Sequence, residues 1–600
     1  MWLRALEMTA HIPHDRTRTL PVVVQDLART FGEMPAAVSA RETLTYSQLA
    51  RKSNRYARWA RSALAKGEVL CLLMPNRPEY LAIWLGVTRV GGVVSLLNTN
   101  LTGASLAHCI DVVRPKHLIL AQELIDDFRA AQPHVTSDPK VWLSGSGDGD
   151  LPQLEEELGK ISEEELTESE LRSVSIDDRA LCVYTSGTTG LPKAANISHH
   201  RLVYWSHWFA GLLNVQSADR MYNCLPMYHS VGGVVATGAM LVKGGSVAIR
   251  EKFSARQFCD DVVQWDCTLF QYIGELCRYL LRTPVHPREK EHRLRLCCGN
   301  GLGLDVWTEF KTRFQIPQIL EFYASTEGNV SMFNCEGQPG AVGRIPAFLS
   351  HRFPATIVKF DAENDVPFRD ERGFCVRCEP EEAGEVIGKI TSDRANYSGR
   401  FEGYTSEDQT ERKILRNVFE HGDAWFRTGD LMRNDRKGYF YFVDRIGDTF
   451  RWKGENVATY EVSSVIMSFP GIVDATVYGV TIPATDGRAG MAAVVIEDKL
   501  NLDLVAFREH VIMHLPEYAR PLFLRVRKEL EITGTFKKMK CNLVNDGYDP
   551  RHITDSAAIT GIFSMRFVRN LWRSALLSMT EFSQAECDFR RYNAPYLGRD

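Results

Sequence analysis

A short stretch rich in hydroxyls and glycines follows the apolar residues 181–184. It reads YTSGTTGLPKAANIS over residues 184–198. Glycine lets backbone N–H groups approach an anion, hydroxyls add donors, and lysine adds a mobile positive charge. The stretch therefore predicts a phosphate-binding loop, and its candidate residues are Thr185, Ser186, Gly187, Thr188, Thr189, Gly190 and Lys193.

The loop departs from the Walker A pattern, which needs a lysine directly after the last glycine and a helix beginning there. Leu191 and Pro192 separate Gly190 from Lys193, and an alanine follows the lysine. Residues 195–198 read as extended, so we expect the loop to join two strands. A surface hairpin turn is the alternative, but a turn does not require so many hydroxyls together with two glycines and a lysine.

Composition and charge limit the class of protein. The chain has 600 residues, 44% of them hydrophobic, which is enough for two to four domains. Its net charge of −4 gives no electrostatic footprint for nucleic acid, so no nucleic-acid partner is expected. Its fourteen scattered cysteines are typical of reduced thiols in a cytosolic protein.

Two long uncharged stretches, residues 90–110 and 221–242, are each interrupted by polar residues. Polar groups need partners inside a bilayer, so these stretches predict buried elements rather than transmembrane helices. The N-terminus lacks a charged region followed by a long apolar run, and no secretory signal is expected. We predict a cytoplasmic location and leave open a peripheral place on the inner face of a membrane.

The elements that must position the loop alternate between helix and strand. Apolar spacing predicts helices over residues 45–65 and 78–89, and apolar runs predict strands at 68–76 and 117–122. This alternation predicts layered α/β structure with a parallel sheet. The acidic residues 154–171 are typical of a solvated connector.

The pattern changes from residue 436, where the sequence RKGYFYFVDRIGDTFRWKG predicts two strands joined by a Gly-Asp turn. A helix over 461–469, strands over 472–480 and 490–496, and a helix over 502–514 are expected to follow. These elements predict a smaller α+β domain that begins close to Asp444.

Five further stretches carry groups suited to chemistry. They are LPMYHSVGG (225–233), CCGNGLG (297–303), EFYASTEGN (321–329), FRTGDL (426–431) leading into YFYFVDRIGDTFRWKGENV (439–457), and ITGTFKKMK (532–540). In this order and spacing they resemble, from about residue 25 to 550, the adenylate-forming acyl-CoA synthetase superfamily of AMP-binding enzymes. YASTEGN, the aromatic strand and TGTFK are most similar to the fatty acid transport protein and very-long-chain acyl-CoA synthetase family.

The resemblance implies a domain organisation. An N-terminal extension (1–24) would precede a large adenylation domain (25–444) of layered α/β sheets and a distorted β-barrel. A small, mobile α+β domain (445–550) would follow. The tail (551–600) does not resemble the usual family ending; its MRFVRNLWRSALLSM could form a basic amphipathic helix on a membrane surface, and a poorly ordered extension is the alternative.

The resemblance also implies a reaction in two steps. A fatty acid carboxylate would attack the α-phosphate of ATP and form an acyl-adenylate and diphosphate, and the acyl group would then pass to the thiol of coenzyme A. The loop from Thr185 to Lys193 would hold the leaving phosphates. Glu327 would bind Mg²⁺, because this hard cation prefers carboxylate oxygen. Thr326 would donate to a phosphate.

Other residues have roles that the resemblance implies. Tyr323 would lie against adenine, with Gly299 and Gly301 lining the base pocket. The ribose hydroxyls would bind Asp430, which Arg445 adjoins, and His229 would lie near the substrate carboxylate and gate the acyl pocket. Lys537 would bridge the carboxylate and the α-phosphate and offset their charge. The small domain would rotate about a hinge at Gly447 and Asp448.

Two other functions remain open at this point. The chain could be a ligase for another bulky carboxylate, such as a bile-acid-like or aryl acid, or a non-catalytic lipid carrier or uptake protein. Glu327, Asp430 and Lys537 argue against the carrier, which has no need of a site for leaving phosphates. The acyl chain length cannot be read from the sequence, which also leaves a homodimer open.

Overall fold

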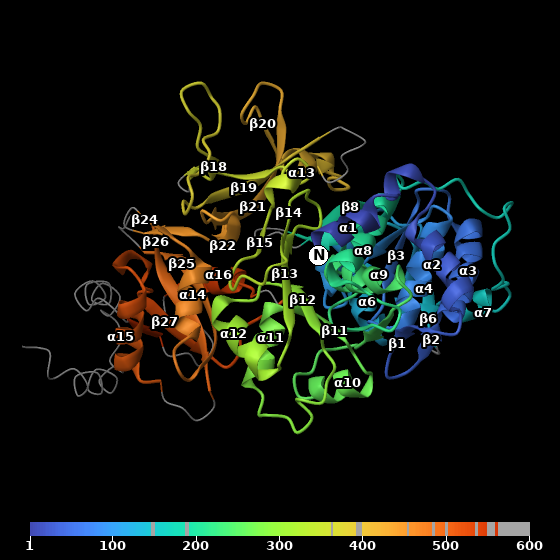
Figure 1. The fold of residues 1–600 in the computed structure, drawn as a ribbon, viewed down its shortest axis with the longest axis horizontal. Coiled ribbons are helices and arrows are strands. Elements are labelled where there is room, and N and C mark those ends of the chain that lie inside the picture. The colour runs from blue at the N-terminus through green and yellow to red at the C-terminus, as the bar shows by residue number, and fades with distance from the viewer. Residues whose placement is uncertain are drawn as a thin grey trace, which may run out of the picture. The chain divides into compact units, whose positions relative to one another are not determined.

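A computed structural model describes residues 1–145, 150–185, 191–361, 364–391, 399–452, 455–482, 487–497, 502–533 and 538–548, and the backbone of 559–561 (Figure 1). The chain forms two compact units. The first comprises Met1–Asp448 and Glu531–Met539, and the second comprises Thr449–Leu530 and the chain from Lys540 onward. The first boundary follows directly after the segment expected to hold the hinge.

A six-stranded sheet in the first unit carries the predicted loop. Its strands follow the order β6-β5-β3-β4-β7-β8, and all pairs are parallel except β7 with β8. The strands are β3 (Val69–Leu73), β4 (Val93–Leu96), β5 (His117–Ala121), β6 (Lys140–Ser144), β7 (Arg179–Thr185) and β8 (Lys193–Ser198).

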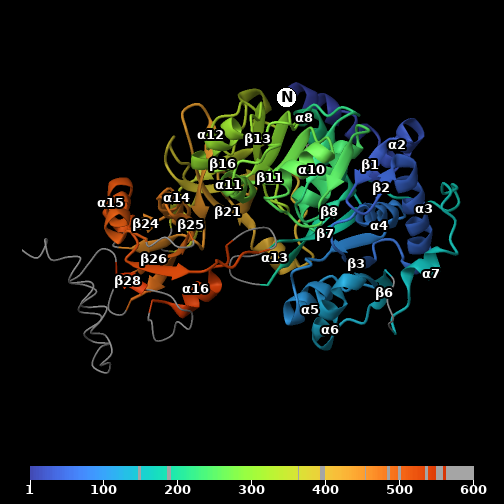
Figure 2. The same ribbon diagram turned by 90° about the horizontal axis from the view of Figure 1, so that it is seen from below.

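This sheet is buried on both faces, as parallel sheets usually are. Leu70 and Leu72 of β3 belong to one hydrophobic cluster, whereas the alternate residues Val69, Cys71 and Leu73 belong to another. Figure 2 shows α4 (Pro78–Arg89) on one side of the sheet and α5 (Gly103–Asp111) with α6 (Ile125–Ala131) on the other. The predicted α/β class, and with it the helix at 78–89, is confirmed.

The second sheet of this unit has fourteen strands and changes character along its length. β1, β10, β9, β11, β12 and β13 are parallel neighbours, and β14, β15, β22, β21, β19 and β16 continue the sheet with antiparallel pairing. This antiparallel part is the region in which the distorted barrel was expected. The strands are β1 (Pro35–Val38), β2 (Thr43–Thr45), β9 (Arg220–Asn223), β10 (Ser246–Ile249), β11 (Leu269–Ile273), β12 (Leu296–Asn300), β13 (Gln318–Ala324), β14 (Ser331–Asn334), β15 (Gly343–Arg344), β16 (Ala355–Val358), β19 (Gly384–Lys389), β20 (Ile414–Arg416), β21 (Ala424–Asn434) and β22 (Tyr439–Arg445).

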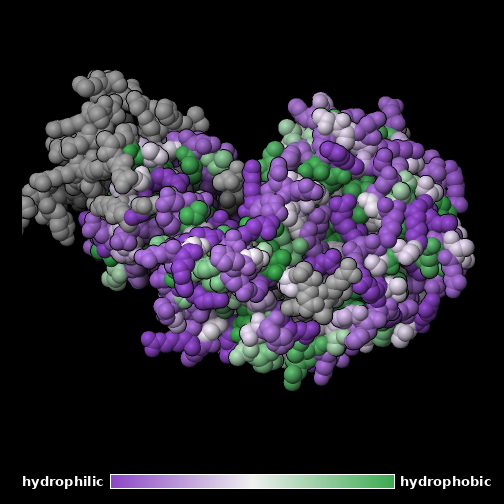
Figure 3. All heavy atoms as spheres, turned by 90° about the horizontal axis from the view of Figure 1, so that it is seen from above, coloured by the Kyte–Doolittle hydropathy of each residue, from purple (hydrophilic) through white to green (hydrophobic). Residues whose placement is uncertain are grey.

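The uncharged stretches fold into buried elements, as predicted. Residues 221–242 form β9, a π-helix at Val231–Val235 and α9 (Ala236–Leu241). No helix in the described part of the chain is long and apolar enough to cross a membrane. On the face shown in Figure 3, hydrophilic residues predominate and hydrophobic ones occur singly or in small groups. The other helices of the unit are α1 (Trp2–Thr9), α2 (Leu20–Phe31), α3 (Tyr46–Ala63), α7 (Leu154–Leu158), α8 (His199–Leu213), α10 (Phe258–Gln264), α11 (Gly274–Arg282), α12 (Leu304–Arg313) and α13 (Glu407–Glu411).

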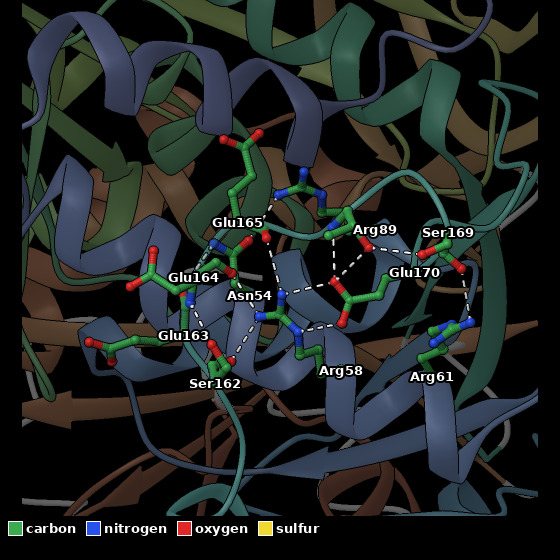
Figure 4. A network of polar contacts seen from close by, with 11 residues as sticks. Asn54, Arg58, Arg61, Arg89, Ser162, Glu163, Glu164, Glu165, Ser169 and Glu170 are labelled. Carbon is green, nitrogen blue, oxygen red and sulfur yellow. Dashed lines mark hydrogen bonds and ion pairs between the residues drawn. The ribbon is translucent and has the colours of Figure 1, made fainter.

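The acidic residues 154–171 are more than a solvated connector. After α7 this segment runs along α3, whose arginines recur at helical spacing (Figure 4). Arg58 pairs with Glu170 at 2.7 Å and donates to the carbonyls of Ser162 and Glu164. The arginines of α3 face the glutamates of this segment along the helix. Their ion pairs and hydrogen bonds hold the connector against α3.

The second unit is a small α+β structure. Its sheet follows the order β25-β26-β27-β28, with β25 (Ile472–Thr481), β26 (Arg488–Ile496), β27 (Phe523–Arg527) and β28 (Ile559–Gly561). The helices α14 (Thr459–Met467), α15 (Leu504–His514) and α16 (Cys541–Asp546) and the hairpin of β23 (Phe450–Trp452) and β24 (Glu455–Val457) complete it. The predicted strands at 472–480 and 490–496 and both predicted helices are present.

We predict that acid destabilises the first unit through α8. Burial lowers the pKa of His199 and His207 to about 4 and that of His200 to about 3. Below about pH 6.5 the unfolded chain binds protons that the folded chain excludes, so stability falls as the pH drops from 6.5 towards 4. The fall should reach at most about 1.4 kcal/mol per pH unit for each histidine.

Chemical denaturation between pH 7.5 and 5 measures this dependence. His200→Phe should flatten the profile, because a ring that cannot bind a proton replaces the imidazole stacked on Tyr204. His134→Gln, at an exposed position, serves as the control and should leave the profile unchanged. A profile that His200→Phe leaves as steep as the wild type would contradict the assignment.

Candidate active site

The predicted phosphate loop joins the antiparallel strands β7 and β8. Thr185, the last residue of β7, faces Lys193, the first residue of β8, in the register of the pair. The prediction that the loop joins two strands is confirmed. Ser186, Gly187, Thr188, Thr189 and Gly190 lie outside the described residues.

Lys193 lies at an edge of the site where positive charge accumulates. Burial, together with the nearby Lys413 and Arg412, lowers the pKa of its ammonium group, and the carboxylate of Glu327 acts in the opposite direction. Its Nζ also lies 5.7 Å from the ring centre of Tyr404. An anion bound here would relieve the repulsion among these cations, so the local charges suit phosphate.

Glu327 is buried and directed into the same region by Tyr404. The Tyr404 hydroxyl donates to Glu327 Oε1 at 2.9 Å, and both side chains are less than a tenth exposed. The segment around Tyr404 adds to the free edge of β8, since Asn196 N–H donates to the Gly403 carbonyl and Thr405 N–H to the Ala194 carbonyl. The Tyr404 hydroxyl is therefore fixed between the hairpin and Glu327.

Arg201, in the first turn of α8, supports the loop that carries Glu327. Its Nη1 donates to the Thr326 carbonyl at 2.7 Å and its Nη2 to the Gly328 carbonyl at 3.0 Å. One guanidinium group therefore binds the backbone on both sides of Glu327. Its Nε lies 3.9 Å from Glu402 Oε2. Glu402 in turn accepts from the Ser198 N–H and hydroxyl at the N-terminus of α8.

Ser230, which follows His229 in the chain, contacts Thr326. The Ser230 and Thr326 hydroxyls are 2.9 Å apart and buried. His229 is half-buried in the turn that leads into the π-helix, and its carbonyl accepts from Gly233 N–H. π-Helical turns of this kind are frequent at functional sites. The structure thus brings the histidine turn and the Thr326 loop into one place.

A second group of predicted residues gathers at the ends of β13, β21 and β22. The Tyr323 hydroxyl donates to Asp430 Oδ2 at 2.6 Å, and Arg445 Nε lies 3.6 Å from Asp430 Oδ1. Burial and the Asp430 carboxylate raise the pKa of Tyr323 well above its usual value. The phenol therefore stays protonated and holds the carboxylate in place.

Gly299 and Gly301 lie at the carboxyl end of β12, next to β13. A side chain at Gly299 would meet the carbonyl of Tyr272 at 2.3 Å, so only glycine fits there. Gly301 has a φ of +79°, which favours glycine for the turn itself. The turn lies beside β13, the strand that carries Tyr323, so one ligand can contact both.

The remaining predicted residues concern the second half of the chain. Gly447 adopts a φ of +95°, and Asp448 is the last residue of the first unit's main segment. Lys537 lies outside the described residues. Two neighbouring lysines have partners within their own units: Lys538 Nζ is 3.7 Å from Glu275 Oε1, and Lys540 Nζ donates to the Thr459 hydroxyl.

Sequence reasoning missed Tyr404, Arg201, Ser230 and Glu402. Ser230 adjoins the predicted His229, and Arg201 follows the loop strand directly, so a search of residues next to the motifs could have found these two. Tyr404 and Glu402 lie about 75 residues after Thr326 and Glu327, and only the pairing of their segment with β8 brings them close.

Comparisons with known proteins identify the family and the fold. The sequence matches the AMP-binding enzyme family over residues 24–385 and the AMP-binding enzyme C-terminal domain over 461–537, so the second match ends on Lys537. It is 39% identical to mouse long-chain fatty acid transport protein 1 over 92% of this chain and 86% of that protein. It is 40% identical to the human protein of the same name over 90% of this chain and 84% of that protein.

The chain belongs to the long-chain fatty acid transport protein family of AMP-binding enzymes. Its fold is similar to a solved anthranilate CoA ligase in complex with anthranoyl-AMP, with a TM-score of 0.74 and 17% identity over 88% of this chain and 96% of that one. The predicted family, fold class and enzyme class, an ATP-dependent ligase that joins an acid to coenzyme A, are thereby confirmed.

We predict that Arg201→Met destabilises this family member by about 3 kcal/mol, because it leaves two backbone carbonyls and the Glu402 carboxylate with fewer partners in a buried place. Chemical denaturation measures the change in free energy of unfolding. Arg416→Met is the matched control, since its ion pair with Glu411 is about 60% exposed on both sides, and it should cost less than about 1 kcal/mol. Equal losses in the two variants would contradict the role of Arg201.

Proposed function

We propose that this chain is a fatty acyl-CoA synthetase that converts ATP, a long-chain or very-long-chain fatty acid and coenzyme A into acyl-CoA, AMP and diphosphate. The observation that carries the proposal is the convergence of Glu327, Thr326 and Lys193 around Tyr404 and Ser230. Phosphoryl transfer depends mainly on positioning and charge neutralisation, and these groups suit both tasks. The printed names of the relatives support a fatty acid as the acid substrate.

The residues around Glu327 fit a magnesium ion that is bound together with a nucleotide. Tyr404 occupies Oε1 of Glu327 only, so Oε2 can serve as an oxygen ligand. Among the described residues no group of three or more His, Cys, Asp or Glu side chains could hold a metal alone. That agrees with Mg²⁺, which protein sites bind through one or two carboxylates and the substrate phosphates. When bound, it would neutralise charge on the phosphates.

The phosphates of ATP would lie against the β7–β8 hairpin. Lys193 would contribute its charge and Thr185 its hydroxyl, with the intervening residues 186–190 as further donors. Thr326 would donate to a phosphate from a position fixed by Ser230. These groups would hold diphosphate as it leaves, while AMP stays attached to the acyl chain.

The nucleoside of ATP would lie at the ends of β12 and β13. Tyr323 would lie against the adenine face, and Gly299 and Gly301 would let the backbone approach the base. Asp430 would accept from both ribose hydroxyls, since a carboxylate has acceptor sites to spare after it has bound Tyr323 and Arg445. His229 would lie near the substrate carboxylate and gate the acyl pocket.

Lys537 would bring together the fatty acid carboxylate and the α-phosphate during adenylate formation. Its place at the end of the matched C-terminal domain supports this role. Rotation of the 445–550 domain about Gly447 and Asp448 would withdraw the lysine before thioester formation, and the positive φ of Gly447 suits a hinge.

A role in fatty acid transport is a second candidate, favoured by the printed names of the relatives. A carrier that lacks synthetase activity would bind fatty acid independently of ATP and release no AMP. For location we propose the cytoplasm, since all cysteines in the described residues are free thiols. A peripheral place on a membrane rests on the basic stretch 565–579 of the tail, which lies outside the described residues.

Incubation of the purified protein with ATP, Mg²⁺, coenzyme A and acids from C8 to C24 should release AMP and diphosphate, with long-chain or very-long-chain acids saturating at the lowest concentrations. Coupled assays for both products measure the rate. Aryl and bile-acid-like acids belong in the same panel. If one of these saturates the enzyme at the lowest concentration, the protein is a ligase for that class of acid and not for fatty acids. If no acid in the panel causes release of AMP and diphosphate, the proposed synthetase activity is refuted.

Lys537→Ala tests the mechanism in the same assay. It should abolish adenylate formation and largely spare thioester formation from a supplied acyl-adenylate, since the lysine acts in the first step only. Lys538→Ala is the matched control, because its ammonium group already pairs with Glu275, and it should retain adenylate formation. Equal loss of both half-reactions in Lys537→Ala would show that another residue has this role.

A further inference from the structure

A buried carboxylate on β13 has no place in the reaction described so far. Glu321 is 2% exposed and lies two residues before Tyr323 on the same strand. Its Oε1 accepts from the Leu302 N–H at 3.0 Å, and its Oε2 accepts from the Tyr272 hydroxyl at 2.5 Å. Both oxygens are therefore engaged by donors of the protein itself.

Keeping an ionised carboxylate at this depth is unfavourable. Burial raises the pKa of Glu321 to about 8, although its hydrogen bonds from Tyr272 and Leu302 act against that rise, so the carboxyl group is largely protonated near pH 7. An apolar side chain of similar volume would avoid the desolvation cost. What it could not do is accept the hydrogen bond from the Leu302 backbone N–H.

The Leu302 N–H belongs to the turn that leaves β12 at the predicted base pocket. β12 and β13 lie side by side (Figure 1), and Glu321 faces Gly299 in their register, so the hydrogen bond to Leu302 N–H comes from the neighbouring strand. The turn is also confined from the β11 side, where a side chain at Gly274 would meet the Gly301 carbonyl at 1.8 Å. Steric confinement limits where the turn can lie, and the carboxyl group of Glu321 fixes the direction of the Leu302 N–H.

We propose that Glu321 is a positioning residue for the nucleotide base. It holds the turn from Gly299 to Leu302 at a fixed distance from Tyr323, so that the two sides of the base pocket form one rigid unit on β12 and β13. The proposal rests on the proposed function, since it assumes that ATP binds at this turn. Because both oxygens bind protein donors, Glu321 does not itself touch the reacting atoms.

The proposal predicts a selective effect on ATP. Glu321→Met removes the acceptor and leaves the Leu302 N–H without its partner, so the KM for ATP should rise about tenfold. The KM for the fatty acid and the kcat at saturating ATP should stay within about twofold, because the phosphate and acyl groups are held elsewhere. The preference for ATP over GTP should fall by a similar factor, because a loosened turn discriminates bases poorly.

Two more variants separate positioning from general stability. Glu321→Gln keeps the volume and one acceptor oxygen, so its ATP KM should lie between those of the wild type and Glu321→Met. Glu289→Gln is the matched control: Glu289 is equally buried, pairs with Arg313 at 2.9 Å and lies outside the site. It should lower the denaturation midpoint and leave both the ATP KM and the ATP preference unchanged.

Measurement of all variants beside the wild type keeps the two claims apart. An inactive wild type refutes the proposed function. If the wild type is active and both Glu321 variants have the same ATP KM and the same ATP preference as the wild type, the positioning role is refuted. If Glu321→Met does not fold, Glu321→Gln decides, because an ATP KM equal to that of the wild type would then overturn the inference.

Discussion

The candidate active site depends on the guanidinium group of Arg201. It binds the carbonyls on both sides of Glu327, and Glu402 balances its charge. Glu402 also holds the N-terminus of α8 through Ser198. One buried ion pair therefore ties the helix that follows the phosphate hairpin to the loop that carries the proposed metal ligand, and a shift in either segment would be transmitted to the other.

Around this pair, the site follows from the way the two sheets end. β7 and β8 of the six-stranded sheet flank the proposed phosphate loop, whereas β12 and β13 of the fourteen-stranded sheet carry the proposed base pocket and lead into the Thr326 loop. Tyr404 joins the two, since its segment pairs with β8 and its hydroxyl reaches Glu327. In the proposed site, separate sheets of one unit would therefore support the base and the phosphates of a nucleoside triphosphate.

The sequence predicted the fold class and most of the elements because their signals are local. Helix 78–89, the strand at 117–121 and the hairpin around Lys193 follow from apolar periodicity and turn residues close in the chain. The partners of Glu327 could not be predicted in this way. Tyr404 and Arg201 reach it through backbone pairing and helix placement across 77 and 126 residues, and no local pattern encodes such contacts. The acidic connector 154–171 is largely exposed, as predicted, but its arginine partners on α3 could not be read from the local sequence.

The magnesium dependence of Tyr404→Phe tests the central claim most directly, because this change removes one hydroxyl from Glu327 and little else. If Tyr404 orients Glu327 for a metal held with ATP, the Mg²⁺ concentration for half-maximal AMP release should rise several-fold, and excess Mg²⁺ should restore most of the rate. An unchanged Mg²⁺ dependence, or a loss of rate that no Mg²⁺ concentration restores, would contradict the account.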